Sequence, residues 1–143
     1  MGINLEEAML NDKNRIMQEL SSEDFGKATE SNNRPAVVMV KASWCSNCKA
    51  MMPVFEQSAK EMKDAADFYY LTVDDKEELA RSLKIMGVPT TLFYRHGTLI
   101  SKKLGKQNLA SLKKTVEPLV ELNSEEAKDK QYRSLLSRLF GRK

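Results

Sequence analysis

Residues 37–49 read VVMVKASWCSNCK, a stretch that predicts a buried strand followed by a tight corner and a helix. The apolar, β-branched run over 36–42 is typical of a strand that is buried on both faces. Both cysteines of the chain, Cys45 and Cys48, lie at the corner, directly after its only tryptophan, Trp44. No other part of the sequence gathers so many reactive groups, so we expect the function to depend on this corner.

The composition is that of one globular domain with short appendages. The chain has 143 residues, of which 41% are hydrophobic and 30% charged, as in ordinary folded proteins. No apolar run reaches the roughly 20 residues of a membrane helix, and the polar, acidic start lacks the apolar core of a secretory signal. We therefore expect a cytoplasmic location, although a processed mature chain would have the same composition.

The net charge of +3 is concentrated in one segment. Residues 122–143 hold six lysines and arginines against three acids, which leaves 17 groups of each sign in residues 1–121. The basic pI therefore results from the charges of the tail and does not indicate a nucleic-acid-binding surface. No nucleic-acid partner is predicted.

Hydrophobic periodicity along the chain predicts an α/β domain with a central mixed β-sheet flanked by helices. The expected strands are 36–42, 67–73, the end of 87–94, and 99–104, and the expected helices are 22–30, 50–62, 76–83 and 108–116. Residues 15–20 fit either a helix or a short strand. A tight hairpin is expected at 95–98, and prolines should kink the second helix (Pro53) and bend or end the last one (Pro118).

A Cys-x-x-Cys pair can serve a zinc site or redox chemistry. A closed zinc site needs about four ligands, and the chain offers one histidine, His96, and no third cysteine. His96 lies in the predicted hairpin turn, where we expect a solvated side chain. No metal site is predicted, because metal binding would need a second chain or carboxylates.

The redox interpretation requires only the two cysteines. A cysteine at a helix N-terminus meets unpaired N–H groups and the positive end of the helix dipole, which favour the thiolate. We therefore expect Cys45 to be the nucleophile, exposed enough to attack, and Cys48, one turn further in, to be the shielded resolving thiol. Lys49 and Lys41 add positive charge nearby. No bound cofactor is expected, because the two sulfurs carry the redox equivalents.

The sequence WCSNCK at 44–49 resembles the active site of the thioredoxin superfamily, and the resemblance covers residues 15–121. Pro53 matches the kinking proline of the family's active-site helix, and Val88-Pro89-Thr90 resembles its cis-proline loop. Three further residues also match positions of the family pattern: Asp74, Gly97 and Gly105. The resemblance implies the thioredoxin fold and a thiol–disulfide oxidoreductase that acts on disulfide-containing proteins. It also implies a recycling reductase that reduces the disulfide formed between Cys45 and Cys48.

The resemblance also implies a substrate-binding set formed by Trp44, Val88, Pro89 and Thr90. Pro89 is expected to be cis and to pack beside Cys45, so that the backbone of Val88 can pair with an extended substrate. The alternatives are that Pro89 merely starts an edge strand and that Trp44 is a plain core residue.

The chain departs from the family pattern where the family tunes its chemistry. Ser46-Asn47 replaces the usual Gly-Pro between the cysteines, and these residues together with Lys49 set the stability of the thiolate. Met39 stands in place of the family's buried acid, and Tyr70 in place of its lysine partner. We expect a protein-disulfide reductase, while an oxidant, an isomerase or a non-catalytic binding module remain alternatives.

Three segments are expected in the chain. They are an N-terminal extension over 1–14, a thioredoxin-like domain over 15–121 and a basic amphipathic C-terminal helix over 122–143. Asn123 and Glu126 fit a helix cap, and an apolar stripe follows at Tyr132, Leu135, Leu136, Leu139 and Phe140. This helix has three possible roles: packing on its own domain, docking to a partner or its own copy, or lying on a membrane surface.

Overall fold

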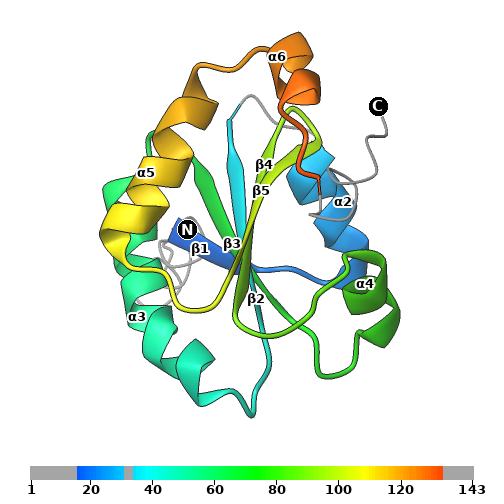
Figure 1. Cartoon of the computed structure of the whole chain (residues 1–143). Coiled ribbons are helices and arrows are strands. Elements are labelled where there is room, and N and C mark those ends of the chain that lie inside the picture. Colours follow the sequence, from blue (N-terminus) through cyan, green and yellow to red (C-terminus); the bar gives the residue numbers. More distant parts are fainter. Residues whose placement is uncertain (1–15, 31–33, 134–143) are drawn as a thin grey trace, which may run out of the picture.

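The computed structural model describes residues 16–30 and 34–133 (Figure 1). Its strands are β1 (Met17–Glu19), β2 (Ala36–Lys41), β3 (Asp67–Thr72), β4 (Thr90–Arg95) and β5 (Thr98–Leu104). Its helices are α2 (Ser22–Glu30), α3 (Ser46–Glu61), α4 (Glu77–Ser82), α5 (Leu109–Val120) and α6 (Ser124–Asp129). None of the helices within these described ranges is long and apolar enough to cross a membrane.

The five strands form one mixed sheet in the order β1-β3-β2-β4-β5. β3 pairs in parallel with both β1 and β2, whereas β4 pairs antiparallel with β2 and with β5. The mixed sheet predicted from the sequence is therefore confirmed, and residues 17–19 form a strand rather than a continued helix. The predicted hairpin is also present, with both turn residues at positive φ, His96 at 52° and Gly97 at 77°.

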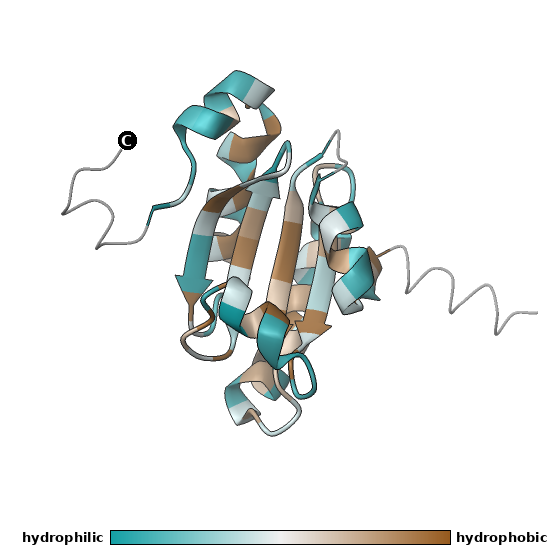
Figure 2. Ribbon diagram, turned by 90° about the vertical axis from the view of Figure 1, so that its right-hand side faces the viewer, coloured by the Kyte–Doolittle hydropathy of each residue, from teal (hydrophilic) through white to brown (hydrophobic). Residues whose placement is uncertain are grey.

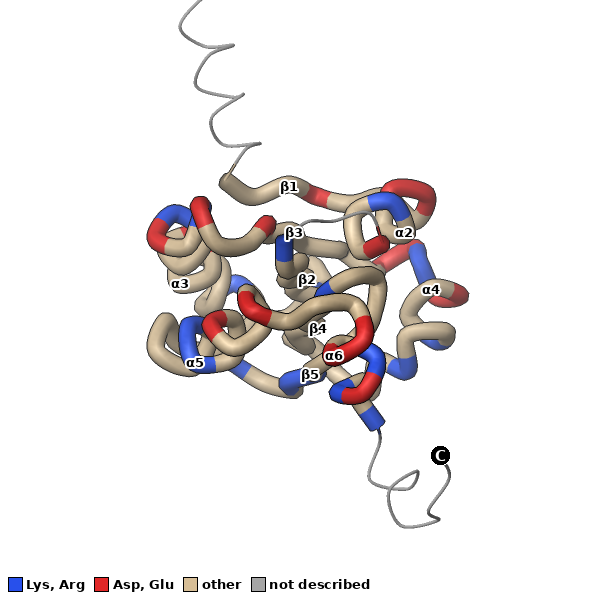
Figure 3. The backbone as a smooth tube through the Cα atoms, turned by 90° about the horizontal axis from the view of Figure 1, so that it is seen from above, with Lys and Arg blue, Asp and Glu red and all other residues tan. Residues whose placement is uncertain are grey.

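Helices cover both faces of the sheet. α3 and α5 lie on one face and α2 and α4 on the other, so the sheet is the middle of three layers (Figures 1 and 3). Apolar strands run between the helical layers (Figure 2). Along β2, Val37 and Met39 belong to the cluster beneath α3 and α5, while Val38 and Val40 belong to the opposite cluster. Because alternate side chains of a strand point to opposite faces, an uninterrupted apolar run is what a doubly covered strand requires.

Of the two effects predicted for Pro118, to bend or to end the last helix, an end at the proline itself is not seen, because α5 continues two residues further to Val120. The end of the helix is held from outside, because the buried Arg95 donates from Nε to the Leu119 carbonyl at 2.9 Å and from Nη2 to the Val120 carbonyl at 3.2 Å. A guanidinium at the C-terminus of a helix satisfies carbonyls that have no partner within the helix, and it complements the helix dipole.

His96 also contacts the chain at the C-terminal end of α5 and is not the solvated turn residue that the sequence predicted. Its ring is half-buried, and Nε2 lies 2.8 Å from the carbonyl of Leu122, just after α5.

Pro53 lies inside α3, which runs through it as one helix from Ser46 to Glu61.

The C-terminal helix is shorter than predicted. α6 begins with the expected capping box of Asn123 and Glu126 but ends at Asp129. The chain then returns to the sheet, where the Tyr132 N–H donates to the Leu99 carbonyl of β5 at 2.7 Å. The amine of Lys102, also on β5, lies 5.9 Å from the centre of the Tyr132 ring. The rest of the predicted apolar stripe, like the extension over 1–14, lies outside the described residues.

Candidate active site

The corner between β2 and α3 makes Cys45 the N-cap of the helix. Cys45 has extended backbone angles (φ −90°, ψ 110°), and its Sγ accepts a hydrogen bond from the Cys48 backbone N–H at 3.1 Å. The sulfur thus takes the place that a Ser or Asp oxygen takes in an ordinary cap. The sulfur thus faces a backbone N–H donor and the positive end of the helix dipole.

The two cysteines are free thiols at different depths. Cys45 is 6% exposed and Cys48 is 0% exposed, the order that the sequence predicted. Cys45 is nevertheless more enclosed than expected, because its Sγ also lies 3.6 Å from the carbonyl oxygen of Val88. A substrate sulfur can therefore approach Cys45 only along its remaining open side, and Cys48 only through Cys45.

The Val88–Pro89 peptide bond is cis, as predicted. The loop is fixed by two hydrogen bonds, from the Gly105 N–H to the Pro89 carbonyl at 2.8 Å and from the Thr90 hydroxyl to the Gly87 carbonyl at 2.6 Å. The strand that follows, β4, lies between β2 and β5, so the alternative of a proline that merely starts an edge strand is wrong.

Thr90 does not present its side chain to a substrate, because it is 1% exposed and its hydroxyl is bound to Gly87. This hydrogen bond helps to shape the loop that Val88 and Pro89 form, and a contact of Thr90 with a substrate would have to use its backbone. Trp44, in contrast, is 76% exposed, which excludes the alternative of a core tryptophan. Ser46, Asn47 and Lys49 are exposed on the first turn of α3.

Two apolar side chains beside the cis-proline loop were missed in the sequence. Met86, just before the loop, is 86% exposed, and Leu104, opposite Thr90 on β5, is 63% exposed. Leu104 packs near Gly87, where its Cδ1 lies 3.3 Å from the position that a β-carbon on the glycine would take. Together with Trp44 they give this part of the surface an apolar character. Their positions could have been found from the sequence, because Met86 precedes Pro89 by three residues and Leu104 lies opposite Thr90 across the predicted hairpin.

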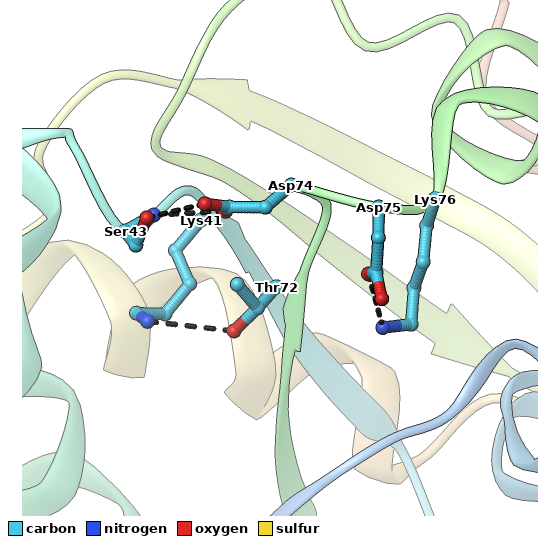
Figure 4. A network of polar contacts seen from close by, with 6 residues as sticks. All are labelled: Lys41, Ser43, Thr72, Asp74, Asp75 and Lys76. Carbon is cyan, nitrogen blue, oxygen red and sulfur yellow. Dashed lines mark hydrogen bonds and ion pairs between the residues drawn. The ribbon is translucent and has the colours of Figure 1, made fainter.

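A polar pair holds the corner from the side of β3. Asp74 accepts a hydrogen bond from the Ser43 N–H at 2.9 Å and a second one from the Ser43 hydroxyl (Figure 4). These hydrogen bonds lower the pKa of the Asp74 carboxyl. Both residues follow the carboxyl ends of parallel neighbouring strands, β2 and β3, and the pairing of these strands brings them together at one edge of the sheet.

Burial and, to a smaller extent, the hydrogen bond with the Cys45 side chain raise the pKa of the Cys48 thiol from 9.0 to about 11. A backbone hydrogen bond with Ala42 and the charge of Lys41 act in the opposite direction. Cys48 is thus a neutral thiol in the reduced protein at neutral pH, consistent with a group that reacts second.

The raised pKa of Cys48 predicts how the reduced protein responds to alkali. As the pH rises from about 9 to about 11, the thiol of the unfolded chain loses its proton before that of the folded chain, so the free energy of unfolding falls. Carbon-13 NMR of labelled cysteine should give a Cys48 midpoint near 11. A Cys48→Ala variant should lose less stability across this pH range than the wild type, and a midpoint at or below 9 would contradict the prediction.

The structure brings no metal ligands to the cysteines. His96 follows the end of β4, whereas the cis-proline loop precedes the start of this strand, so the histidine and the thiols belong to opposite ends of the sheet. Within residues 16–30 and 34–133, no group of three or more histidine, cysteine or acidic side chains is arranged to hold a metal ion.

Comparisons with known proteins agree with this geometry. The thioredoxin family model matches residues 16–118, a range that contains both the cysteine corner and the cis-proline loop. Thioredoxin-2 of Saccharomyces cerevisiae is 32% identical over 101 residues, which cover 71% of this chain and 95% of that protein. The bifunctional thioredoxin reductase/thioredoxin of Mycobacterium leprae is 29% identical over 114 residues, which cover 79% of this chain and 25% of that protein.

Among solved structures, that of Malassezia sympodialis thioredoxin matches with a TM-score of 0.65 and 26% identity, covering 73% of this chain and 90% of that one. The family model spans far more than half of the sequence, and the solved thioredoxin structure shares the fold described above. This chain therefore belongs to the thioredoxin family.

Proposed function

We propose that this protein is a thiol–disulfide oxidoreductase that reduces disulfide bonds in other proteins through Cys45 and Cys48. One observation carries the proposal: the Cys45 sulfur caps α3 and keeps a small exposed area (6%), while Cys48, 0% exposed, lies one turn behind it. Membership in the thioredoxin family supports thiol–disulfide exchange as the general chemistry. The reducing direction is our own inference from this arrangement.

The reaction consists of two exchanges. The Cys45 thiolate attacks one sulfur of the substrate disulfide, the substrate S–S bond breaks, and the departing thiolate takes a proton from solvent. The Cys48 thiolate then attacks the Cys45 sulfur of this mixed disulfide and releases the second substrate thiol. Two electrons pass from the dithiol to the substrate, and the protein is left with a Cys45–Cys48 disulfide.

The surface around Cys45 supports a protein substrate. Trp44 and Met86 offer exposed apolar area, and the cis Val88–Pro89 bond places a backbone segment beside the thiol. We propose that an extended segment of the substrate pairs with Val88 as an added strand while its disulfide reaches Cys45.

The disulfide left on the protein has to be reopened by a reductase. A related protein from Mycobacterium leprae joins a thioredoxin reductase to a thioredoxin in one chain. We propose that an enzyme of this class recycles the protein, with residues 15–121 as the redox unit and 1–14 and 122–143 as appendages. A cytoplasmic location, where thiols stay reduced, would fit this direction.

An insulin-reduction assay with dithiothreitol tests the proposal. The wild type is expected to accelerate the precipitation of insulin chains, and Cys45→Ser to give the uncatalysed rate, because serine cannot attack a disulfide. Lys60→Ala, an exposed position late in α3, serves as the matched control and should retain the wild-type rate. Equal rates for the wild type and Cys45→Ser would remove the enzyme proposal and favour a non-catalytic binding module.

One observation favours a non-catalytic binding module: the apolar Met39, 0% exposed, occupies the position of the family's buried acid.

The reduction potential of the Cys45–Cys48 pair distinguishes a reductase from a disulfide oxidant or isomerase. We expect a reduction potential more negative than about −230 mV. A potential near the roughly −120 mV of a strong disulfide oxidant would contradict the proposal that the protein reduces disulfides.

A further inference from the structure

The resolving step has to remove a proton from a thiol that the fold has buried. Cys48 is 0% exposed and shares its apolar cluster with Met39 and Phe93, which are also 0% exposed. An apolar environment disfavours the thiolate that has to attack the mixed disulfide. Lys41 lies two positions after Met39 on β2 and therefore starts on the same face of the sheet, and the Tyr70 ring beside its amine packs against the cluster that contains Cys48. The charge of Lys41 opposes the effect of burial on the pKa of this thiol.

Lys41 is held in a defined place at the end of β2. Its Nζ lies 3.4 Å from the Thr72 hydroxyl oxygen and 5.7 Å from the centre of the Tyr70 ring (Figure 4 shows the contact with Thr72). Both contacts follow from the register of β2 with β3, in which Lys41 is opposite Thr72 and Met39 is opposite Tyr70. A hydroxyl and an aromatic face together keep the ammonium group at the corner instead of letting it extend into solvent.

We propose that Lys41 is a positioning residue for the resolving step, in which its ammonium group stabilises the Cys48 thiolate and thereby compensates for the apolar Met39. The inference rests on the proposed function. The lysine does not accept the proton, which passes to solvent; it lowers the free energy of the anion that remains. The Cys48 thiolate then forms the S–S bond with Cys45, and the Cys45–substrate S–S bond breaks with release of a thiolate.

The other charged and titratable groups around Lys41 are few among the described residues. Asp74, from the loop after β3, is bonded to Ser43, and the charge of Lys41 helps to lower the pKa of its carboxyl. Tyr70 on β3 has a pKa raised by burial and by Glu19 of β1, so its ring is neutral at physiological pH. Lys41 is thus the positive group that acts on both Cys48 and Asp74.

The experiment separates the two exchanges with dithiobis(nitrobenzoate) in stopped flow. Attack by Cys45 releases one thionitrobenzoate, and attack by Cys48 on the resulting mixed disulfide releases a second. Lys41→Gln removes the charge but can still bond to Thr72, whereas Lys41→Arg retains the charge. Lys60→Gln removes an exposed lysine of the same domain and is the matched control.

Lys41→Gln is expected to slow the second release roughly tenfold at neutral pH and to move its pH profile upward by about one unit, because a unit charge acts on Cys48 across a partly buried region. Lys41→Arg should stay within about threefold of the wild type, and Lys60→Gln should match it. Lys41→Met provides a second neutral variant if Lys41→Gln unfolds. A change in packing that left the burial of Cys48 unaltered would not move the pH profile.

A second release in Lys41→Gln with the wild-type rate and pH profile would overturn the role of Lys41. So would an arginine variant as slow as the glutamine variant. Failure of the proposed function itself has a different signature: the wild type would then release thionitrobenzoate no faster than Cys45→Ser and would not reduce insulin.

Discussion

Replacing Cys48 with serine is expected to leave the protein covalently joined to its substrates. The first exchange needs only Cys45, whose cap hydrogen bond comes from the backbone N–H of residue 48 and therefore survives the substitution. The second exchange needs a sulfur at position 48, and a buried serine hydroxyl is far less acidic and cannot displace a thiolate. Resolution should slow by at least about 1,000-fold, since the step loses its nucleophile.

Mass spectrometry under non-reducing conditions measures this directly. Cys48→Ser incubated with an oxidised peptide should gain the mass of one peptide thiol, linked to Cys45, and should release it on addition of dithiothreitol. The double variant Cys45→Ser/Cys48→Ser is the control and should gain nothing. The assignment of roles would be lost if Cys45→Ser formed the stable adduct through Cys48, because the fully buried thiol would then be the first to react.

The parts of the fold that the sequence predicts are those with strong local signals. The run from Val37 to Val40 is apolar at every position, which only a strand covered on both faces can bury. Cys45 and Cys48 lie at the start of a helix, and Asn123 with Glu126 forms the expected cap. In each case the signal and the structure lie within a few residues of each other in the chain.

The features that escaped prediction depend on contacts between distant segments. Helix α5 runs past Pro118 to Val120, and Arg95, 23 positions before this proline, binds the carbonyls at the end of the helix. The tail leaves its helix at Asp129, and Tyr132 then bonds to Leu99 of an edge strand. Neither contact has a local pattern, since an arginine at a strand end and a tyrosine in a basic tail are both ordinary.

The same reasoning applies to the active site. The two cysteines at the helix start and the cis-proline loop follow from short motifs. The contacts of Ser43 with Asp74 and of Lys41 with Thr72 depend instead on the parallel register of β2 and β3. A strand register fixes which residues meet, and it becomes known only when the sheet is assembled. The residues that surround the thiols were thus harder to predict than the thiols themselves.

Phe55→Ala is expected to cost about 3–5 kcal/mol of folding free energy, the usual range for removal of a buried aromatic side chain. Phe55 is 0% exposed and anchors the middle of α3 to the sheet, with its ring edge-on to Phe68 of β3 at 5.2 Å between centroids and 65° between planes. Because Cys45 is the N-cap of α3, the anchoring of this helix also fixes the position of the Cys45 sulfur. Urea unfolding followed by circular dichroism measures the loss.

Trp44→Ala is the matched comparison, since it also removes an aromatic side chain, but one that is 76% exposed. Its free energy of unfolding should stay within about 0.5 kcal/mol of the wild type, the usual range for surface substitutions. If Trp44 serves as a substrate platform, the same variant should reduce insulin more slowly despite its unchanged stability. A Phe55→Ala variant that lost less than about 1 kcal/mol, far below the range for a buried aromatic ring, would show that α3 is held chiefly by its other contacts, Met51 and Ala59 among them.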